Sequence, residues 1–222
     1  MELMTGYYRQ KEDHTALLLQ QYVCRGVPVC LGCICGGESR EAGMAGGLFT
    51  GQLREEFCGS DLLKAVENRE RFLRGMERQL CKSRESCGAP TDFRTAGILC
   101  VGERFLLFSQ GEVKIVLCNA GFGRPALQEI MGGKGEERQR LRIQWGSMEM
   151  GIGILLASES LYRAIPQEDM ENCLWVKNIN DSRQTQKRVQ ELGRAAEKRN
   201  GKGMGALLLE VRQSVGGSMQ GR

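Results

Sequence analysis

Three carboxylates of this chain stand where they could take part in chemistry: Glu12, Asp13 and Glu159. Glu159 follows a short apolar run, 152–157, and such a run bounded by glycine and polar residues is typical of a fully buried strand. A rigid strand delivers the carboxylate at its end to a surface crevice. The same pattern also fits a core strand followed by an exposed turn, and Glu12 with Asp13 alone fits a solvated pair.

Cysteines offer a second kind of chemistry, because Cys30, Cys33 and Cys35 form a C-x₂-C-x-C cluster. Structural zinc usually needs a second ligand pair at a comparable turn, and only Cys81 and Cys87 are available, at a loose spacing. In a strand, Cys33 and Cys35 share one face and Cys30 lies on the other. We therefore predict buried, reduced cysteines that pack as small hydrophobes.

Two further motifs carry little weight. A nucleophilic cysteine needs a base, and the single histidine, His14, shows no pairing with a cysteine in the sequence. The Gly-Gly-Lys-Gly stretch at 132–135 lacks the spacing of a phosphate-binding loop and its strand-loop-helix setting, so it predicts a plain loop.

Composition limits the class of protein. With 222 residues, 41% apolar and 26% charged, the chain has the profile of a globular domain. A net charge of +4, spread along the sequence, lacks the concentrated basic face of a nucleic-acid-binding protein. No apolar run nears the roughly 20 residues that cross a bilayer, and the polar N-terminus is unlike a signal peptide. We expect no nucleic-acid partner, no membrane partner and a cytoplasmic location.

Hydrophobic periodicity predicts strands and helices in groups. We expect strands at 15–24, 26–35, 94–101, 104–110, 112–118, 141–150, 152–157 and 206–213. We expect helices at 38–57, 61–83, 166–179 and 182–200. The first two strands form a hairpin with its turn at Arg25-Gly26, the strands at 94–118 form a meander, and 119–137 is a loop.

This grouping predicts the α+β class, in which two antiparallel sheets pack face to face and helices flank them as a four-layer α-β-β-α sandwich. Within the helix at 38–57, an apolar stripe that includes Leu48 and Phe49 is expected to face the core. We expect one domain, 1–213, followed by a flexible tail, 214–222.

The order of five sequence stretches resembles that of the type 2C (PPM) metal-dependent protein serine/threonine phosphatases, especially the short bacterial forms, from about Gly6 to Arg212. GYYRQKEDHTALLL is similar to the opening strand with its Glu-Asp pair. LGCICGGESREAGMAGG is similar to the strand, Asp-Gly-Met-Gly-Gly turn and helix. The other three stretches resemble the central meander, the strands before the Ser-Asp-Gly motif, and the closing Asp-Asn motif with its last strand, and they are TAGILCVGERFLLFSQGEVKIVLC, LRIQWGSMEMGIGILLASESLY and EKRNGKGMGALLLEV.

The family uses two Mn²⁺ or Mg²⁺ ions to hydrolyse phosphoserine and phosphothreonine, and the resemblance implies which residues stand at its metal positions. Glu12 and Asp13 keep the Glu-Asp pair, and Glu159 replaces the Asp of Ser-Asp-Gly. The bridging Asp falls at about Cys33 or Ile34. The remaining positions are the closing Asp and Asn, replaced by Gly203 and Met204, and a phosphate-binding Arg, for which Arg9 is available one residue closer to the Glu-Asp pair than expected.

Hard divalent ions need several anionic oxygen ligands, and the bridging ligand and one further carboxylate are missing. The resemblance therefore implies a pseudophosphatase that acts in phospho-signalling or as a binding module, with a phosphoprotein or signalling protein as partner. It implies Mn²⁺ or Mg²⁺ as cofactor if the protein has one at all. Two alternatives stay open. One is an active, divergent phosphatase that uses Glu12, Asp13 and Glu159, and the other is an unrelated α+β interaction domain.

Overall fold

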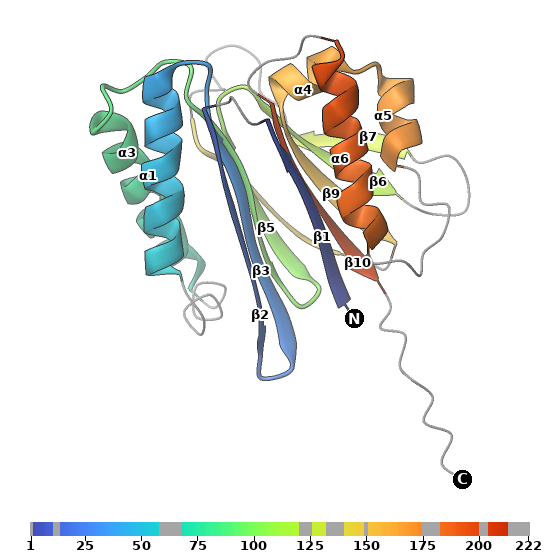
Figure 1. Cartoon of the computed structure of the whole chain (residues 1–222). Coiled ribbons are helices and arrows are strands. Elements are labelled where there is room, and N and C mark those ends of the chain that lie inside the picture. The colour runs from blue at the N-terminus through green and yellow to red at the C-terminus, as the bar shows by residue number, and fades with distance from the viewer. Residues whose placement is uncertain are drawn as a thin grey trace.

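The computed structural model describes residues 2–10, 14–57, 68–119, 126–131, 140–148, 151–174, 183–199 and 204–212. In this part of the chain two antiparallel five-stranded sheets pack face to face between two layers of helices (Figure 1). The predicted α+β sandwich is confirmed. The predicted tail, 214–222, lies outside the described residues.

The first sheet has the strand order β1-β10-β9-β6-β7. Its strands are β1 Glu2–Arg9, β10 Gly205–Arg212, β9 Ile152–Ser158, β6 Val113–Asn119 and β7 Ala126–Met131. The second sheet has the order β2-β3-β4-β5-β8. Its strands are β2 Thr15–Cys24, β3 Val27–Gly36, β4 Arg94–Val101, β5 Arg104–Gln110 and β8 Arg142–Ser147.

Each sheet has its own helix layer. The first sheet is covered by α4 Glu159–Ala164, α5 Gln167–Leu174 and α6 Arg183–Glu197, and the second sheet by α1 Arg40–Glu56 and α3 Arg69–Glu85. The described part of the second predicted helix is confirmed as α3, at whose start the side chain of Asn68 accepts from the Arg71 N–H at 3.1 Å, whereas 61–67 lies outside the described residues. Among the described residues, no helix has the length and apolarity that crossing a bilayer takes.

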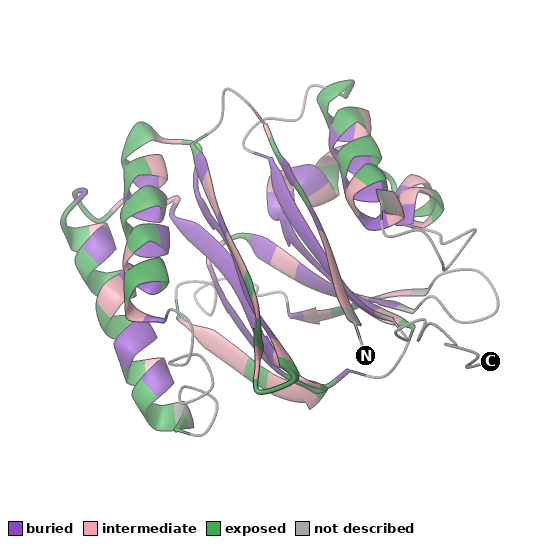
Figure 2. Ribbon diagram, turned by 60° about the horizontal axis from the view of Figure 1, so that its bottom comes forward, coloured by how far each residue is buried: buried purple, intermediate pink, exposed green. Residues whose placement is uncertain are grey.

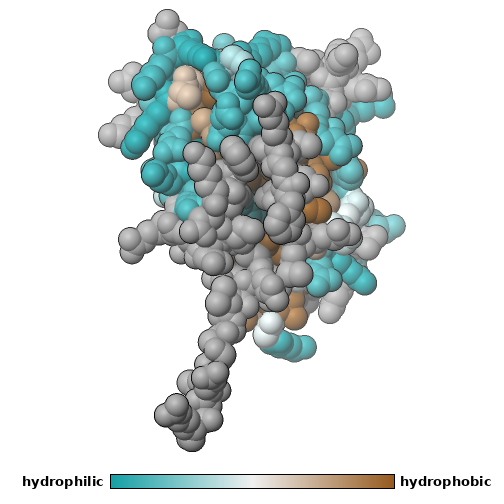
Figure 3. Space-filling model, turned by 90° about the vertical axis from the view of Figure 1, so that its right-hand side faces the viewer, coloured by the Kyte–Doolittle hydropathy of each residue, from teal (hydrophilic) through white to brown (hydrophobic). Residues whose placement is uncertain are grey.

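Three apolar clusters fill the spaces between the layers. One lies between the sheets, one under α1 and α3, and one under α4, α5 and α6, so that the inner strands are buried on both faces (Figure 2). This explains the continuous apolar run of β9, the middle strand of the first sheet. On the side of the molecule that carries α5 and α6, most of the described residues visible at the surface are hydrophilic (Figure 3).

Turn chemistry accounts for two connections. Arg25 and Gly26 both have positive φ, 52° and 78°, as a two-residue hairpin turn requires, and Cys24 pairs with Val27. The predicted hairpin is thereby confirmed. At Gly111, φ is 80° and a Cβ would lie 2.6 Å from the Phe93 carbonyl oxygen, so only glycine fits this crossing point.

Two predictions about the strands are wrong. The third meander strand, β6, crosses at Gly111 into the first sheet and pairs there with β7 and β9 rather than with β5. β7 lies inside the segment predicted as a loop. β1 is absent from the strands predicted by periodicity, but it overlaps the opening strand that the resemblance implied. In α1, Leu48 is exposed, whereas its neighbour Phe49 is fully buried as expected.

A buried ion pair fixes α6 to the first sheet. Arg188 on α6 donates to the Glu210 carboxylate on β10, and both side chains are less than a tenth exposed. The Thr185 hydroxyl donates to the same carboxylate at 2.6 Å, and Arg188 also donates to the Leu174 carbonyl oxygen at 2.7 Å. The pair therefore joins β10, α6 and the end of α5.

Removing one member of this pair leaves the other charge buried without its partner. We expect Glu210→Ala to lower the free energy of unfolding by about 3–5 kcal/mol, as for other buried pairs. The apolar double variant Arg188→Met with Glu210→Leu should cost less than that single change. Urea unfolding followed by circular dichroism measures both, and a loss below about 1 kcal/mol in Glu210→Ala would contradict the assignment.

Candidate functional site

Strand ends of both sheets meet along one edge of the sandwich, which we call the rim. In the first sheet, the Gln10 N–H, just after β1, donates to the Met204 carbonyl oxygen at 3.2 Å. The Gly205 N–H at the start of β10 donates to the Ser158 hydroxyl at the end of β9, also at 3.2 Å. In the second sheet, the Gly37 N–H, after β3, donates to the carbonyl oxygen of His14 at 3.4 Å. A Cβ added at Gly205 would lie 2.9 Å from the Cγ2 of Thr15, so the starts of β10 and β2, which belong to different sheets, lie side by side at this edge.

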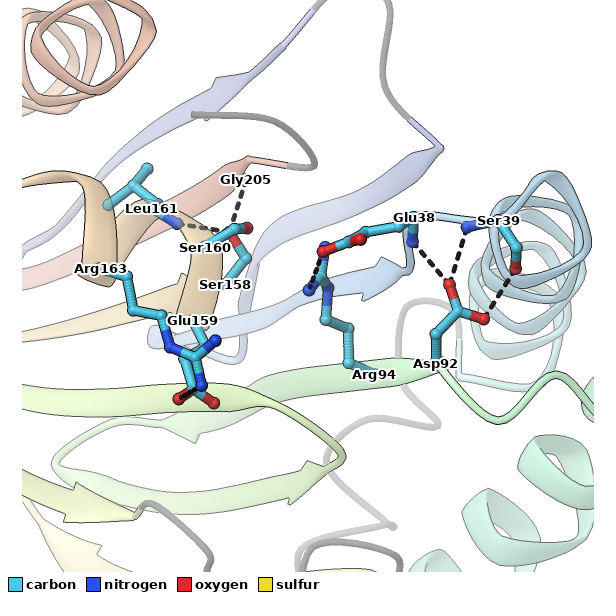
Figure 4. Close-up of polar contacts among 10 residues, drawn as sticks. All are labelled: Glu38, Ser39, Asp92, Arg94, Ser158, Glu159, Ser160, Leu161, Arg163 and Gly205. Carbon is cyan, nitrogen blue, oxygen red and sulfur yellow. Dashed lines mark hydrogen bonds and ion pairs between the residues drawn. The ribbon is translucent and has the colours of Figure 1, made fainter. Parts of the chain in front are cut away.

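Ser158 organises the end of β9. Its hydroxyl oxygen caps α4 by accepting from the Leu161 N–H at 3.4 Å, and it lies 3.1 Å from the Ser160 hydroxyl (Figure 4). The polar residues that end the apolar run therefore act as a helix start, and α4 begins directly at Glu159.

Glu159 lies directly after β9, and its side chain is largely buried. The residue is 8% exposed, and its carboxylate accepts from the Arg163 guanidinium, one helical turn on, at 2.7 Å (Figure 4). Its N–H donates to the Glu112 carbonyl oxygen at 3.2 Å, which ties α4 to the turn before β6. The charge of this carboxylate is thus compensated by a side chain of the same short helix.

Asp92 closes the other half of the rim by clamping the start of α1. Its carboxylate accepts from the N–H groups of Glu38 and Ser39, each at 2.7 Å, and from the Ser39 hydroxyl at 2.7 Å (Figure 4). Ser39 in turn caps α1 by accepting from the Ala42 N–H at 3.2 Å. Partial burial acts to raise the pKa of Asp92, but the hydrogen bonds from Ser39 and Glu38 outweigh it and lower that pKa below its ordinary value.

Arg94 places a buried cation at the half of the rim where α1 begins. The first residue of β4, it is 5% exposed, and its guanidinium lies 3.9 Å from the exposed carboxylate of Glu38 (Figure 4). Asp92 holds the main-chain N–H of Glu38, and Arg94 lies near its carboxylate, so both the main chain and the side chain of Glu38 have a partner at the rim.

The end of β3 holds no carboxylate. The Cys33 sulfur lies 3.3 Å from the Thr95 hydroxyl in the cluster under α1, and Ile34 packs between the sheets. At Gly36, a Cβ would lie 2.0 Å from the His14 carbonyl oxygen, so that no side chain fits there. Neither face of the strand end offers an oxygen ligand for a metal.

The three clustered cysteines are buried packing residues, as predicted. Cys33 and Cys35 face α1, and Cys30 lies between the sheets, where burial raises its thiol pKa well above the ordinary value. The Cys35 thiol donates to the Gly46 carbonyl oxygen at 3.2 Å, and burial also raises its pKa. Among the described residues, no group of three or more His, Cys, Asp or Glu side chains is placed to hold a metal ion.

The remaining predicted site residues divide into two sets. Arg9 is exposed at the end of β1 and pairs with Gly205, the residue whose N–H reaches Ser158. Glu12, Asp13 and Gly203 lie outside the described residues. Their described neighbours Gln10, His14 and Met204 make the rim contacts given above.

Sequence reasoning missed most of the polar residues that organise the rim. Arg163 had a usable signal, because a Glu and an Arg four residues apart on a helix face each other. Ser39 also had one, as a serine directly before a helical stripe. Asp92 had none, since its partners lie 53 and 54 residues earlier in the chain.

Three comparisons place this geometry among known proteins. No protein-family model matches the chain, and no curated protein sequence matches it. Solved structures do match. The S. agalactiae serine/threonine phosphatase shares 15% identity with the chain at a TM-score of 0.67, over 95% of this chain and 100% of that one.

Two further solved structures agree. The catalytic domain of the serine/threonine protein phosphatase PstP, in complex with two manganese ions, has 13% identity and a TM-score of 0.67 over 96% of this chain and 100% of its own. Stp1 from Staphylococcus aureus has 10% identity and a TM-score of 0.64 over 96% and 95%. The chain therefore has the fold of the PPM-type serine/threonine phosphatases over nearly its whole length. The fold that the resemblance implied is confirmed.

The Asp92 clamp leads to a prediction about pH. We expect Asp92→Ala to lower the free energy of unfolding by about 1–3 kcal/mol at pH 7, since two N–H groups and a hydroxyl lose their acceptor. Because the folded-state pKa lies below the unfolded value of about 3.9, the clamp is at full strength above that pH and is lost as pH falls through the folded-state pKa.

Chemical denaturation from pH 7 down to pH 3 measures this, and the difference between wild type and Asp92→Ala should shrink in acid. The control is Asp169→Asn, which removes a half-exposed ion pair with Arg199 and should cost less than about 1 kcal/mol. A difference between wild type and Asp92→Ala that grows as the pH falls would contradict the clamp.

Proposed function

We propose that this chain is a pseudophosphatase. It keeps the PPM fold but does not carry out two-metal phosphate hydrolysis, and it acts in phospho-signalling as a module that binds a phosphorylated protein. The observation that carries this proposal is the state of Glu159, which is buried and ion-paired to Arg163 at the rim.

A two-metal centre would need several anionic oxygens aimed at one point, because two dications repel each other strongly. The described residues do not fit that requirement. Glu159 already has a cationic partner, Asp92 accepts three hydrogen bonds from the start of α1, and β3 ends in Cys35 and Gly36. The described residues of the rim therefore do not support hydrolysis by two metal ions.

Binding a phosphate group without hydrolysing it does not need the carboxylates of a two-metal centre. A phosphate dianion is recognised by guanidinium groups, which donate paired hydrogen bonds in a planar fork. Arg163 is 64% exposed in its side chain, and its contact with Glu159 holds it in place. Arg9 is exposed on β1, and only β10 separates β1 from β9, so the two backbones are about 10 Å apart. Both arginines thus belong to strands or helices that meet at the rim.

Catalysis is tested first with p-nitrophenyl phosphate and with a phosphothreonine peptide, each with excess Mn²⁺. We expect no metal-dependent turnover above that of Glu159→Gln, because the rim lacks the charge to hold two ions. Metal-dependent turnover in wild type that disappears in Glu159→Ala would overturn the proposal. It would establish instead an active, divergent phosphatase, with Glu12 and Asp13 as the first ligands to examine.

Binding is tested separately by fluorescence anisotropy with a phosphorylated peptide and its unphosphorylated form. We expect Arg9→Ala and Arg163→Ala each to weaken binding of the phosphorylated form by roughly tenfold, the value of one charge-assisted contact. Lys187→Ala, which removes an exposed cation of α6, serves as the matched control and should leave binding unchanged. Equal affinity for both peptide forms would contradict a phosphate-binding role.

A further inference from the structure

The outer face of α1 carries apolar residues and glycines that the rest of the described chain leaves exposed. Two large apolar side chains are exposed there, Met44 at 55% and Leu48 at 44%. Between and beside them stand Gly47 and Gly51, and a Cβ added at either would meet nothing within 4 Å. Glycine in the middle of an exposed helix weakens it relative to alanine, so these residues cost stability without a packing reason inside the described chain.

The exposed residues of α1 form one continuous band. At 100° per residue they fall within a face about 140° wide, on the side opposite the buried residues. Figure 2 shows this band in green along the helix. In chain order the exposed residues of α1 are Arg40, Glu41, Met44, Gly47, Leu48, Gly51, Arg54 and Glu55.

This band is complementary to itself when a second copy is turned end for end. We place a two-fold axis perpendicular to α1, at the level between Gly47 and Leu48. Each exposed residue of α1 then lies at the same level along the helix axis as another exposed residue of the copy. Met44 then faces Gly51, so that a large side chain meets a gap, and Gly47 beside the axis lets the two backbones approach.

Charge supports the same arrangement. Arg40 is the first residue of α1, where a cation opposes the helix dipole, and Glu55 lies in the last turn, where an anion opposes it. In the antiparallel pair, Arg40 lies at the same height along the helix axis as Glu55 of the copy, and Glu41 at the same height as Arg54, so that opposite charges stand at matching heights. A parallel pairing would instead bring Arg40 against its own copy.

No competing ion pair holds these charges. Within the described residues, neither Arg40 nor Glu55 takes part in a salt bridge. α3 packs along one flank of α1, through contacts such as Ser83 to Gln52 at 2.9 Å, and leaves the outer band uncovered.

We propose that the outer face of α1 is a self-association surface, on which two copies of this chain pair through antiparallel α1 helices. A helix of 17 residues is about 25 Å long, and one such pair lies at the small end of specific interfaces. We therefore expect a weak dimer. The surface lies on α1, and the surface proposal does not depend on the proposed phosphate binding.

Sedimentation equilibrium over a range of chain concentrations tests this surface with charge reversals. Arg40→Glu alone and Glu55→Arg alone should each weaken dimerisation at least tenfold, because each dimer contains the pair twice. The double variant with both changes restores opposite charges and should return the dissociation constant to within about threefold of wild type. Glu197→Arg, an equal charge change on the exposed end of α6, should leave it unchanged.

Gly51→Ala separates loss of the interface from loss of folding, because its expected effects on stability and on dimerisation have opposite signs. It should raise the thermal unfolding midpoint of the monomer, since alanine favours the helix, and at the same time weaken dimerisation by filling the gap that receives Met44. A chain that stays monomeric at the highest concentration, or a dimer whose affinity ignores Arg40→Glu, would overturn the proposal. So would a double charge reversal that fails to restore association.

Discussion

A carboxylate removed from water must be compensated by a cation or by hydrogen-bond donors, and this requirement governs the rim of the sandwich. In this chain Glu159 is compensated by Arg163 and Asp92 by the N–H groups that begin α1. Both contacts also fix the strand ends at which they occur. These two carboxylates therefore take part in holding the fold together.

Contacts between side chains and main-chain groups of the described residues hold the scaffold together. The sheets are joined across their buried faces by an apolar cluster, and α6 is tied to β10 by the buried pair of Arg188 with Glu210. The Ser158 hydroxyl and the Asp92 carboxylate then align the strand ends through main-chain contacts.

Local patterns in the sequence predicted the elements that depend on neighbouring residues. The buried strand before Ser158 and the hairpin at Arg25-Gly26 follow from apolar runs and turn residues. Crossing of β6 into the other sheet could not be predicted, because it depends on how Gly111 packs against Phe93.

The site was predicted less completely than the fold. The exposed position of Leu48 was missed because a helical stripe does not reveal which of its edges faces the core. The role of Asp92 was missed because its contacts lie far away in sequence. The resemblance led to Glu159, but that its charge is compensated by Arg163 became visible only in the structure.

Titration of the intact chain with Mn²⁺ at neutral pH, followed by calorimetry, tests the central claim most directly. Since Glu159 and Asp92 are already compensated within the protein, the account predicts no saturable binding of two ions per chain, and identical traces for wild type and Glu159→Gln. Two tightly bound Mn²⁺ ions per chain, lost on Glu159→Gln, would contradict it.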